Sequence, residues 1–165
     1  MLVEGSCHCG SVQFRVLSDT FYPYQACYCS ICRKTAGGGG YAINLGADAS
    51  TLEVEGAENL SVYQAKLYDR GGPDGVPASE AERFFCRFCG SALWLFSPSH
   101  PDLVHPHASA VDTPLPKPPE HVRIMLDFAA PWAKVPEGDA ERHFAGLPEE
   151  SLEGWHHRHG LTGER

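Results

Sequence analysis

Apolar side chains recur at every second position over several short stretches of this chain. The first stretch is Val12, Phe14 and Val16, which alternate with polar residues as in a strand with one buried face. Seventeen Gly and 13 Pro keep such stretches short. Further stretches rich in β-branched and aromatic residues predict strands at 41–45, 51–55, 60–65, 83–85, 92–96, 102–105 and 121–128. The pattern therefore predicts a mainly β fold.

Helical segments are predicted in only two places. One is a turn of helix directly after Cys32, and the other covers about 148–159, where Pro148 suits the first turn and Gly160 a stop. Residues 70–79 and 113–120 are rich in Gly and Pro and predict surface loops, neither long enough to separate domains. We expect a single domain over residues 1–165, a β fold with a short C-terminal helix.

Composition and charge exclude several classes of protein. Hydrophobic residues make up 42% and charged residues 21% of the 165, which is typical of a folded globular chain. Lys and Arg number 13 against 21 Asp and Glu, a net charge of −8 without a basic block. We therefore expect neither nucleic acid nor a membrane as a partner. The N-terminus lacks a signal-peptide pattern and no apolar run reaches about 20 residues, so we expect a cytoplasmic location.

Seven cysteines are the unusual feature of the composition. An odd number cannot all pair, and the cytoplasm keeps thiols reduced, so we interpret the cysteines as metal or thiol chemistry. Cys86 and Cys89 are separated by two residues and precede Gly90, the pattern of a zinc knuckle. Because a knuckle supplies only two of the four ligands of a structural zinc, we assign the other two to Cys7 and Cys9.

Three further cysteines, Cys27, Cys29 and Cys32, lie within six residues. Three protein ligands with a free fourth position distinguish a catalytic zinc from a structural one, because water or substrate can enter. We therefore interpret this triplet as the ligands of a second, catalytic zinc. Two alternatives stay open, a structural site completed by a histidine and thiol redox chemistry without metal.

The order and spacing of these motifs resemble a known family. The chain carries CHCG, then CYCSICRK followed by four glycines, then FCRFCGS with an apolar strand after it. This arrangement closely resembles the glutathione-dependent formaldehyde-activating enzyme family, which includes the centromere protein V domain. Tyr28 stands between the first two cysteines of the triplet, where many relatives carry His.

The resemblance implies a fold, a set of ligands and an activity. The implied fold is Mss4-like and all-β, with two zinc ions per chain, a structural one on the first and last cysteine pairs and a second on the triplet. The implied reaction condenses glutathione with formaldehyde to S-hydroxymethylglutathione, and its reverse classes the enzyme as a carbon–sulfur lyase. Glutathione is then the expected small-molecule partner. The alternative function is a non-catalytic zinc module that binds a protein or senses thiols or zinc.

Substrate contacts are expected directly beside the triplet. Arg33 and Lys34 supply positive charge, and Gly37 and Gly38 supply free backbone amides, which together suit an anionic thiol such as glutathione. In the alternative interpretation, the two cations offset the charge of three thiolates while the glycines form a tight turn into the next strand.

Two histidines and one acidic residue complete the candidates. His105 and His107 share one face if their segment is a strand, so either is a candidate fourth zinc ligand or proton shuttle. We favour surface or hydrogen-bonded side chains for both. For Asp112 we favour a role in a turn over acid–base catalysis.

Overall fold

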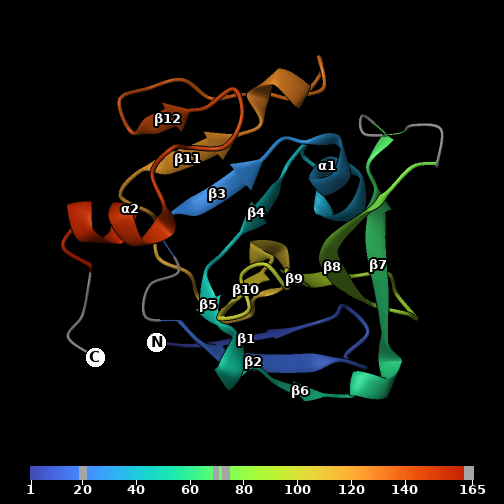
Figure 1. Cartoon of the computed structure of the whole chain (residues 1–165). Helices are drawn as coiled ribbons and strands as arrows, with labels where there is room; N and C mark the ends of the chain where they lie inside the picture. Colours follow the sequence, from blue (N-terminus) through green and yellow to red (C-terminus); the bar gives the residue numbers. More distant parts are fainter. Residues whose placement is uncertain (19–21, 69–70, 72–74, 162–165) are drawn as a thin grey trace.

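The protein is described by a computed structural model that covers residues 1–18, 22–68, 71 and 75–161. Its strands form three sheets of three, five and four strands. Figure 1 shows the three-stranded sheet at the bottom, the five-stranded sheet toward the right and the four-stranded sheet at the upper left. The predicted mainly β fold with a short C-terminal helix is confirmed.

All three sheets are built from short strands. The first sheet has the order β1 (Leu2–Ser6), β2 (Gln13–Leu17), β6 (Glu53–Glu55). The second has the order β5 (Ala47–Asp48), β10 (Leu103–Pro106), β9 (Ala92–Phe96), β8 (Ala78–Cys86), β7 (Leu60–Lys66). The third has the order β12 (Glu141–His143), β11 (His121–Ile124), β3 (Tyr24–Cys27), β4 (Ala42–Asn44). In the described part of the chain, β11 pairs in parallel with β12 and β3, and the other strand pairs are antiparallel.

The helical segments are short. Helix α1 covers Ser30–Ala36, between β3 and β4, and α2 covers Leu152–Arg158 near the end of the described residues. Among the described residues, 3₁₀ turns join strands at Ala49–Thr51, Ala57–Asn59, Ala108–Ala110 and Leu126–Phe128. No helix among the described residues is long and apolar enough to cross a membrane.

Several predicted boundaries are wrong. The strand expected at 121–128 ends at Ile124, because Met125 has a positive φ of 60° and a 3₁₀ turn follows. The predicted strand 83–85 is the end of a nine-residue strand that begins at Ala78, inside the expected loop 70–79. Residues 70 and 72–74 of that loop lie outside the described residues. Helix α2 begins at Leu152 rather than near Pro148, because the Ser151 hydroxyl accepts a hydrogen bond from the Gly154 amide and caps it.

The main core lies between the first two sheets. The Phe14 ring packs edge-on against the Trp94 ring, with 5.4 Å between centroids. The Phe84 ring stacks on the Trp94 ring, with 5.2 Å between centroids. A second cluster lies on the third sheet, where Val122 and Ile124 pack beside Cys27 and Cys32. The cysteine triplet is therefore part of a small core of its own.

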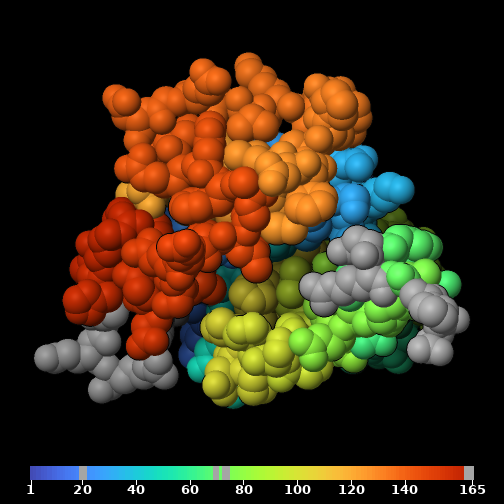
Figure 2. All heavy atoms as spheres, turned by 45° about the horizontal axis from the view of Figure 1, so that its top comes forward, coloured from blue at the N-terminus to red at the C-terminus, as the bar shows by residue number. Residues whose placement is uncertain are grey.

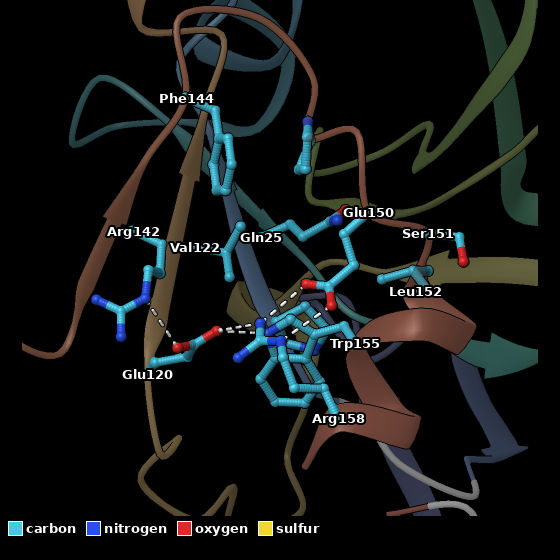
Figure 3. A pocket seen from close by; sticks show the side chains of 12 residues that line it. Gln25, Glu120, Val122, Arg142, Phe144, Glu150, Ser151, Leu152, Trp155 and Arg158 are labelled. Atoms are coloured by element: carbon cyan, nitrogen blue, oxygen red, sulfur yellow. Dashed lines mark hydrogen bonds and ion pairs between the residues drawn. The ribbon is translucent and has the colours of Figure 1, made fainter.

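A buried carboxylate attaches α2 to the third sheet. Glu120, just before β11, accepts a hydrogen bond from the Trp155 indole and pairs with Arg142 and Arg158, each at 3.2 Å (Figure 3). Trp155 is 3% exposed and is the one fully packed side chain of α2. Figure 2 shows the orange and red C-terminal part of the chain gathered on one side of the molecule, with α2 at its edge.

Candidate metal centres and the adjoining cleft

The first candidate metal centre consists of Cys7, Cys9, Cys86 and Cys89. Their sulfurs all lie within 4.8 Å of one another. The Sγ atom of Cys9 is 3.5 Å from that of Cys7 and 3.7 Å from that of Cys86. Four sulfurs bound tetrahedrally to zinc at about 2.3 Å are about 3.8 Å apart. The cluster therefore has the dimensions of a four-thiolate zinc site.

Two equivalent turns bring these cysteines together. In the β1–β2 turn, the Gly10 amide donates to the Cys7 carbonyl at 2.9 Å, and in the β8–β9 turn the Gly90 amide donates to the Cys86 carbonyl at 2.9 Å. Both glycines have φ near +74°, a conformation that favours glycine over residues with a Cβ. Each turn thus contributes one buried sulfur, Cys7 or Cys86, and one exposed sulfur.

The second candidate centre is the triplet at the junction of β3 and α1. Cys27 ends β3, Cys29 is the N-cap of α1, and Cys32 lies in its first turn. Their sulfurs lie within 4.8 Å of one another, and no fourth His, Cys, Asp or Glu joins the group among the described residues. The predicted histidine-completed structural site therefore has no support in the described part of the chain.

Hydrogen bonding makes Cys29 the most acidic thiol of the triplet. Contacts with the Cys27 and Cys32 thiols lower the pKa of Cys29 to about 2 against the effect of burial, and the amides of Cys32 and Ile31 lower it further. The Cys32 amide donates to the Cys29 sulfur at 3.3 Å. Hydrogen bonding to the other two thiols raises the pKa of Cys27, which keeps the shared proton. At neutral pH the triplet thus carries a thiolate at its most accessible sulfur.

A buried polar network that the sequence analysis missed lies behind the triplet. The Tyr28 side chain is 0% exposed; its hydroxyl accepts a hydrogen bond from Arg123 Nη1 at 3.1 Å and donates to the Lys134 carbonyl at 3.2 Å. Arg123 is paired with Glu141. The available signal was a charged residue, Arg123, between two apolar positions of a predicted strand. The network fixes the residue between the first two cysteines of the triplet.

The residues expected to contact substrate follow the triplet along the chain. Arg33 and Lys34 lie on α1, where Lys34 is exposed and Arg33 is half-buried. The Nε atom of Arg33 has no hydrogen-bond partner among the described residues. The Gly40 amide donates to the Gly37 carbonyl at 3.2 Å, so the glycines do form a turn into β4. A Cβ at Gly37 would lie 2.4 Å from the Tyr41 carbonyl oxygen, whereas Gly38 is exposed with open space around it.

A cleft of about 300 Å³ opens beside α1, and Thr35, Arg83 and His107 contribute to its wall. The contact with the Cys27 thiol and the positive charge of Arg83 lower the pKa of Cys32, whereas the contact with Cys29 and burial raise it, and the net shift is upward. Burial, and then the positive charge of Arg83, lower the pKa of His107 to about 4, so its imidazole is neutral at physiological pH. The sequence analysis did not select Arg83, because nothing in its local sequence links it to the triplet.

Both histidines are hydrogen-bonded, as the favoured interpretation expected. His105 Nδ1 lies 3.0 Å from the Leu45 carbonyl, and His107 Nδ1 lies 3.0 Å from Asn44 Oδ1. Neither belongs to a metal-binding group among the described residues. With Nδ1 engaged, the unprotonated Nε2 of His107 is the ring atom left to face a ligand in the cleft.

A known protein family matches most of this chain. The sequence model of a family described as "Glutathione-dependent formaldehyde-activating enzyme" matches residues 2–125. The chain belongs to this family. The matched range contains both cysteine groups and ends inside the segment that follows β11. The resemblance stated from the motifs is thereby confirmed.

Two relatives support membership of the formaldehyde-activating enzyme family. A protein of Halomonas elongata named "Putative glutathione-dependent formaldehyde-activating enzyme" is 56% identical over 161 residues, 98% of each chain. A crystal structure of a Rhodobacter sphaeroides protein, a structural-genomics target, is 33% identical with a TM-score of 0.51, covering 68% of this chain and 91% of that one.

Proposed function

We propose that this protein is a zinc-dependent enzyme that condenses glutathione with formaldehyde to S-hydroxymethylglutathione, and that it is a carbon–sulfur lyase in the reverse direction. The observation that carries the proposal is the triplet: three cysteine sulfurs at one point, no fourth protein ligand among the described residues, and a cleft beside α1, the helix that contains Cys32. Membership of the formaldehyde-activating enzyme family supports the same reaction.

The proposal assigns one zinc to each cysteine group. Cys7, Cys9, Cys86 and Cys89 would hold a structural ion, since four sulfurs satisfy a closed site. Cys27, Cys29 and Cys32 would hold the second, which when bound supplies the positive charge that favours the thiolate form of a substrate. The chain would act as one Mss4-like domain over 1–165 in the cytoplasm, where its seven free thiols stay reduced.

The reaction balances with glutathione and formaldehyde alone. The sulfur electron pair forms the new carbon–sulfur bond, the π pair of the carbonyl moves to oxygen, and the proton lost by the thiol is taken up by that oxygen. Arg83, in the wall of the cleft beside α1, attracts an anionic substrate in this proposal. Neutral His107 accepts a hydrogen bond from the product hydroxyl through Nε2.

Positive charge and free amides next to the triplet hold the substrate in this proposal. Arg33 and Lys34 attract an anionic peptide, and Gly37 and Gly38 present backbone amides at the end of α1. Replacement of Arg33 or Lys34 by Ala should weaken glutathione binding severalfold with both zinc ions retained. Unchanged affinity would instead assign the two cations to charge compensation of the thiolates.

Exchange spectroscopy by NMR with ¹³C-formaldehyde and glutathione tests the function. The purified protein with two zinc ions per chain should accelerate formation of the hydroxymethyl thioether, and Cys29→Ser should abolish the acceleration. Ser30→Ala, an exposed neighbour on α1, is the matched control and should retain it. A fully metallated wild-type protein that leaves the spontaneous rate unchanged would refute catalysis and favour a non-catalytic zinc module.

A further inference from the structure

Two clefts on this protein share one wall and form a single groove. The first, of about 300 Å³, contains Arg83 and His107, and the second, of about 610 Å³, contains Ser6, Ser109 and Asp112. Thr35, Gly90 and Ala92 line both clefts. Because these three shared residues belong to α1 and to the β8–β9 turn, the groove runs between α1 and the turn that carries Cys86 and Cys89.

The groove passes along α1, one helical turn after Cys32. Thr35 follows Cys32 by three residues in α1, so the two side chains lie on the same face of the helix. The Thr35 hydroxyl donates to the Ile31 carbonyl at 2.8 Å, which fixes its position on the groove wall. A molecule lying along the groove therefore has its middle at Thr35, one helical turn from Cys32.

The two ends of the groove carry opposite charges. Among the described residues that line it, Arg83 is the only Lys or Arg and Asp112 is the only Asp or Glu. Arg83 has no carboxylate partner in the described part of the chain, and its Nη1 reaches only the Ala81 carbonyl at 3.4 Å. Asp112 has no cationic partner there either, and its Oδ2 accepts a hydrogen bond from the Ser6 hydroxyl at 2.6 Å.

The Asp112 end is suited to a positively charged group. Besides Asp112, the lining there includes Cys7, one of four sulfurs that together carry more negative charge than a divalent ion neutralises. The Ser6 and Ser109 hydroxyls add hydrogen-bonding groups and no charge. An ammonium group placed here meets a carboxylate, whereas at the Arg83 end it meets a cation.

We propose that the groove selects glutathione by its two ends, with Arg83 binding the glycyl carboxylate and Asp112 binding the γ-glutamyl ammonium. The inference rests on the proposed function, because it takes glutathione as the thiol. The orientation follows from the charges: the γ-glutamyl end carries an ammonium beside its carboxylate, whereas the glycyl end carries a carboxylate alone, and reversal would place that lone carboxylate against Asp112. Thiols that lack one of these terminal charges would bind less tightly.

Three thiols distinguish the two ends. They are glutathione, its monoethyl ester at the glycyl carboxylate, and N-acetylglutathione, which lacks the ammonium. Calorimetric titration of the zinc-loaded wild-type protein should show weaker binding of both analogues than of glutathione. The affinity for the ester should be about tenfold lower, because Arg83 is half-buried. The affinity for N-acetylglutathione should be a few-fold lower, because Asp112 is exposed.

Each charge-removing variant should erase one preference only. Arg83→Gln should bind glutathione and the ester equally while still discriminating against N-acetylglutathione, and Asp112→Asn should show the reverse. Arg87→Gln and Asp102→Asn are exposed matched controls outside the groove and should keep both preferences.

Three other outcomes would overturn the proposal. A variant that weakens all three thiols by the same factor would show that its residue binds no particular end. Exchanged effects, with Arg83→Gln acting on N-acetylglutathione, would refute the orientation. Neither result bears on the proposed reaction, which the NMR exchange measurement on the wild-type protein tests separately. A wild-type protein that binds none of the three thiols would refute the proposed function and this inference together.

Discussion

Replacement of Glu120 by Gln tests how strongly the C-terminal helix is fastened to the third sheet. The carboxylate is 6% exposed and faces Arg142 and Arg158, both at 3.2 Å, as well as the Trp155 indole. Gln keeps an acceptor for the indole but removes the negative charge between two arginines. The variant should therefore lose the ionic part of the attachment and keep the packing of Trp155.

The exposure of the partners sets the size of the effect. A hydrogen bond to a charged group contributes about 1.5–3 kcal/mol when buried. Arg142 and Arg158 are 49% and 47% exposed, so screening reduces each contribution to roughly 0.5–1 kcal/mol. The free energy of unfolding should fall by about 1–2 kcal/mol, and for a chain of this size Tm by roughly 2–8 °C.

Thermal unfolding followed by circular dichroism at pH 7 measures the change. Glu150→Gln is the matched control, because its exposed carboxylate pairs with the same Arg158 at 2.8 Å, and it should change Tm by roughly 1 °C or less. High salt should narrow the difference between wild type and Glu120→Gln. Equal Tm values for the two variants would refute the argument that burial of Glu120 makes its charge important.

Three further results are expected. A hydrogen bond from Arg123 lowers the pKa of the Glu141 carboxyl. The ion pair therefore stabilises the fold above the ordinary carboxyl pKa of about 4.3, and this stabilisation is lost as pH falls through the lowered pKa. Tm measured from pH 7 to 3 should fall less steeply in Glu141→Gln than in wild type. Tyr28→Phe leaves the buried Arg123 guanidinium and the Lys134 carbonyl without their hydroxyl partner and should cost about 1–3 kcal/mol in urea unfolding, whereas the exposed Tyr63→Phe should cost almost nothing. Cys29→Ser should lower the zinc content, read by elemental analysis, by one ion per chain while the far-ultraviolet spectrum stays native; an unchanged zinc content would contradict the role of the triplet.

Period-two patterning located strands best where one face is buried and the other is solvated. β2 follows this rule, with Phe14 and Val16 buried and their neighbours exposed. β3 was missed because it is nearly buried on both sides, so its sequence YQAC shows no alternation. The end of β11 was missed because Met125 adopts a positive φ, a conformation that its residue type disfavours and that only tertiary contacts select.

The cysteine groups were predictable because metal ligands obey local spacing rules. The turns after Cys7 and Cys86 repeat the same hydrogen bond and the same left-handed glycine, which the motif pattern encodes. The partners of Tyr28 could not be predicted in this way. Arg123 is 95 residues away from it in sequence, and the pair forms only because β11 runs parallel to β3. Contacts made by sheet pairing leave no trace in the local sequence.

The two cysteine groups differ in how much of the fold depends on them. The four-cysteine group joins Cys9 to Cys86, which are 77 residues apart, and so fixes the first sheet to the second. The triplet closes only the short segment from Cys27 to Cys32. Because the entropy of loop closure grows with the logarithm of loop length, a metal in the four-cysteine group restricts the unfolded chain by about 2–3 kcal/mol more than a metal in the triplet. The triplet can therefore exchange a ligand for substrate at little cost to the fold, which is the property that an open metal site in an enzyme requires.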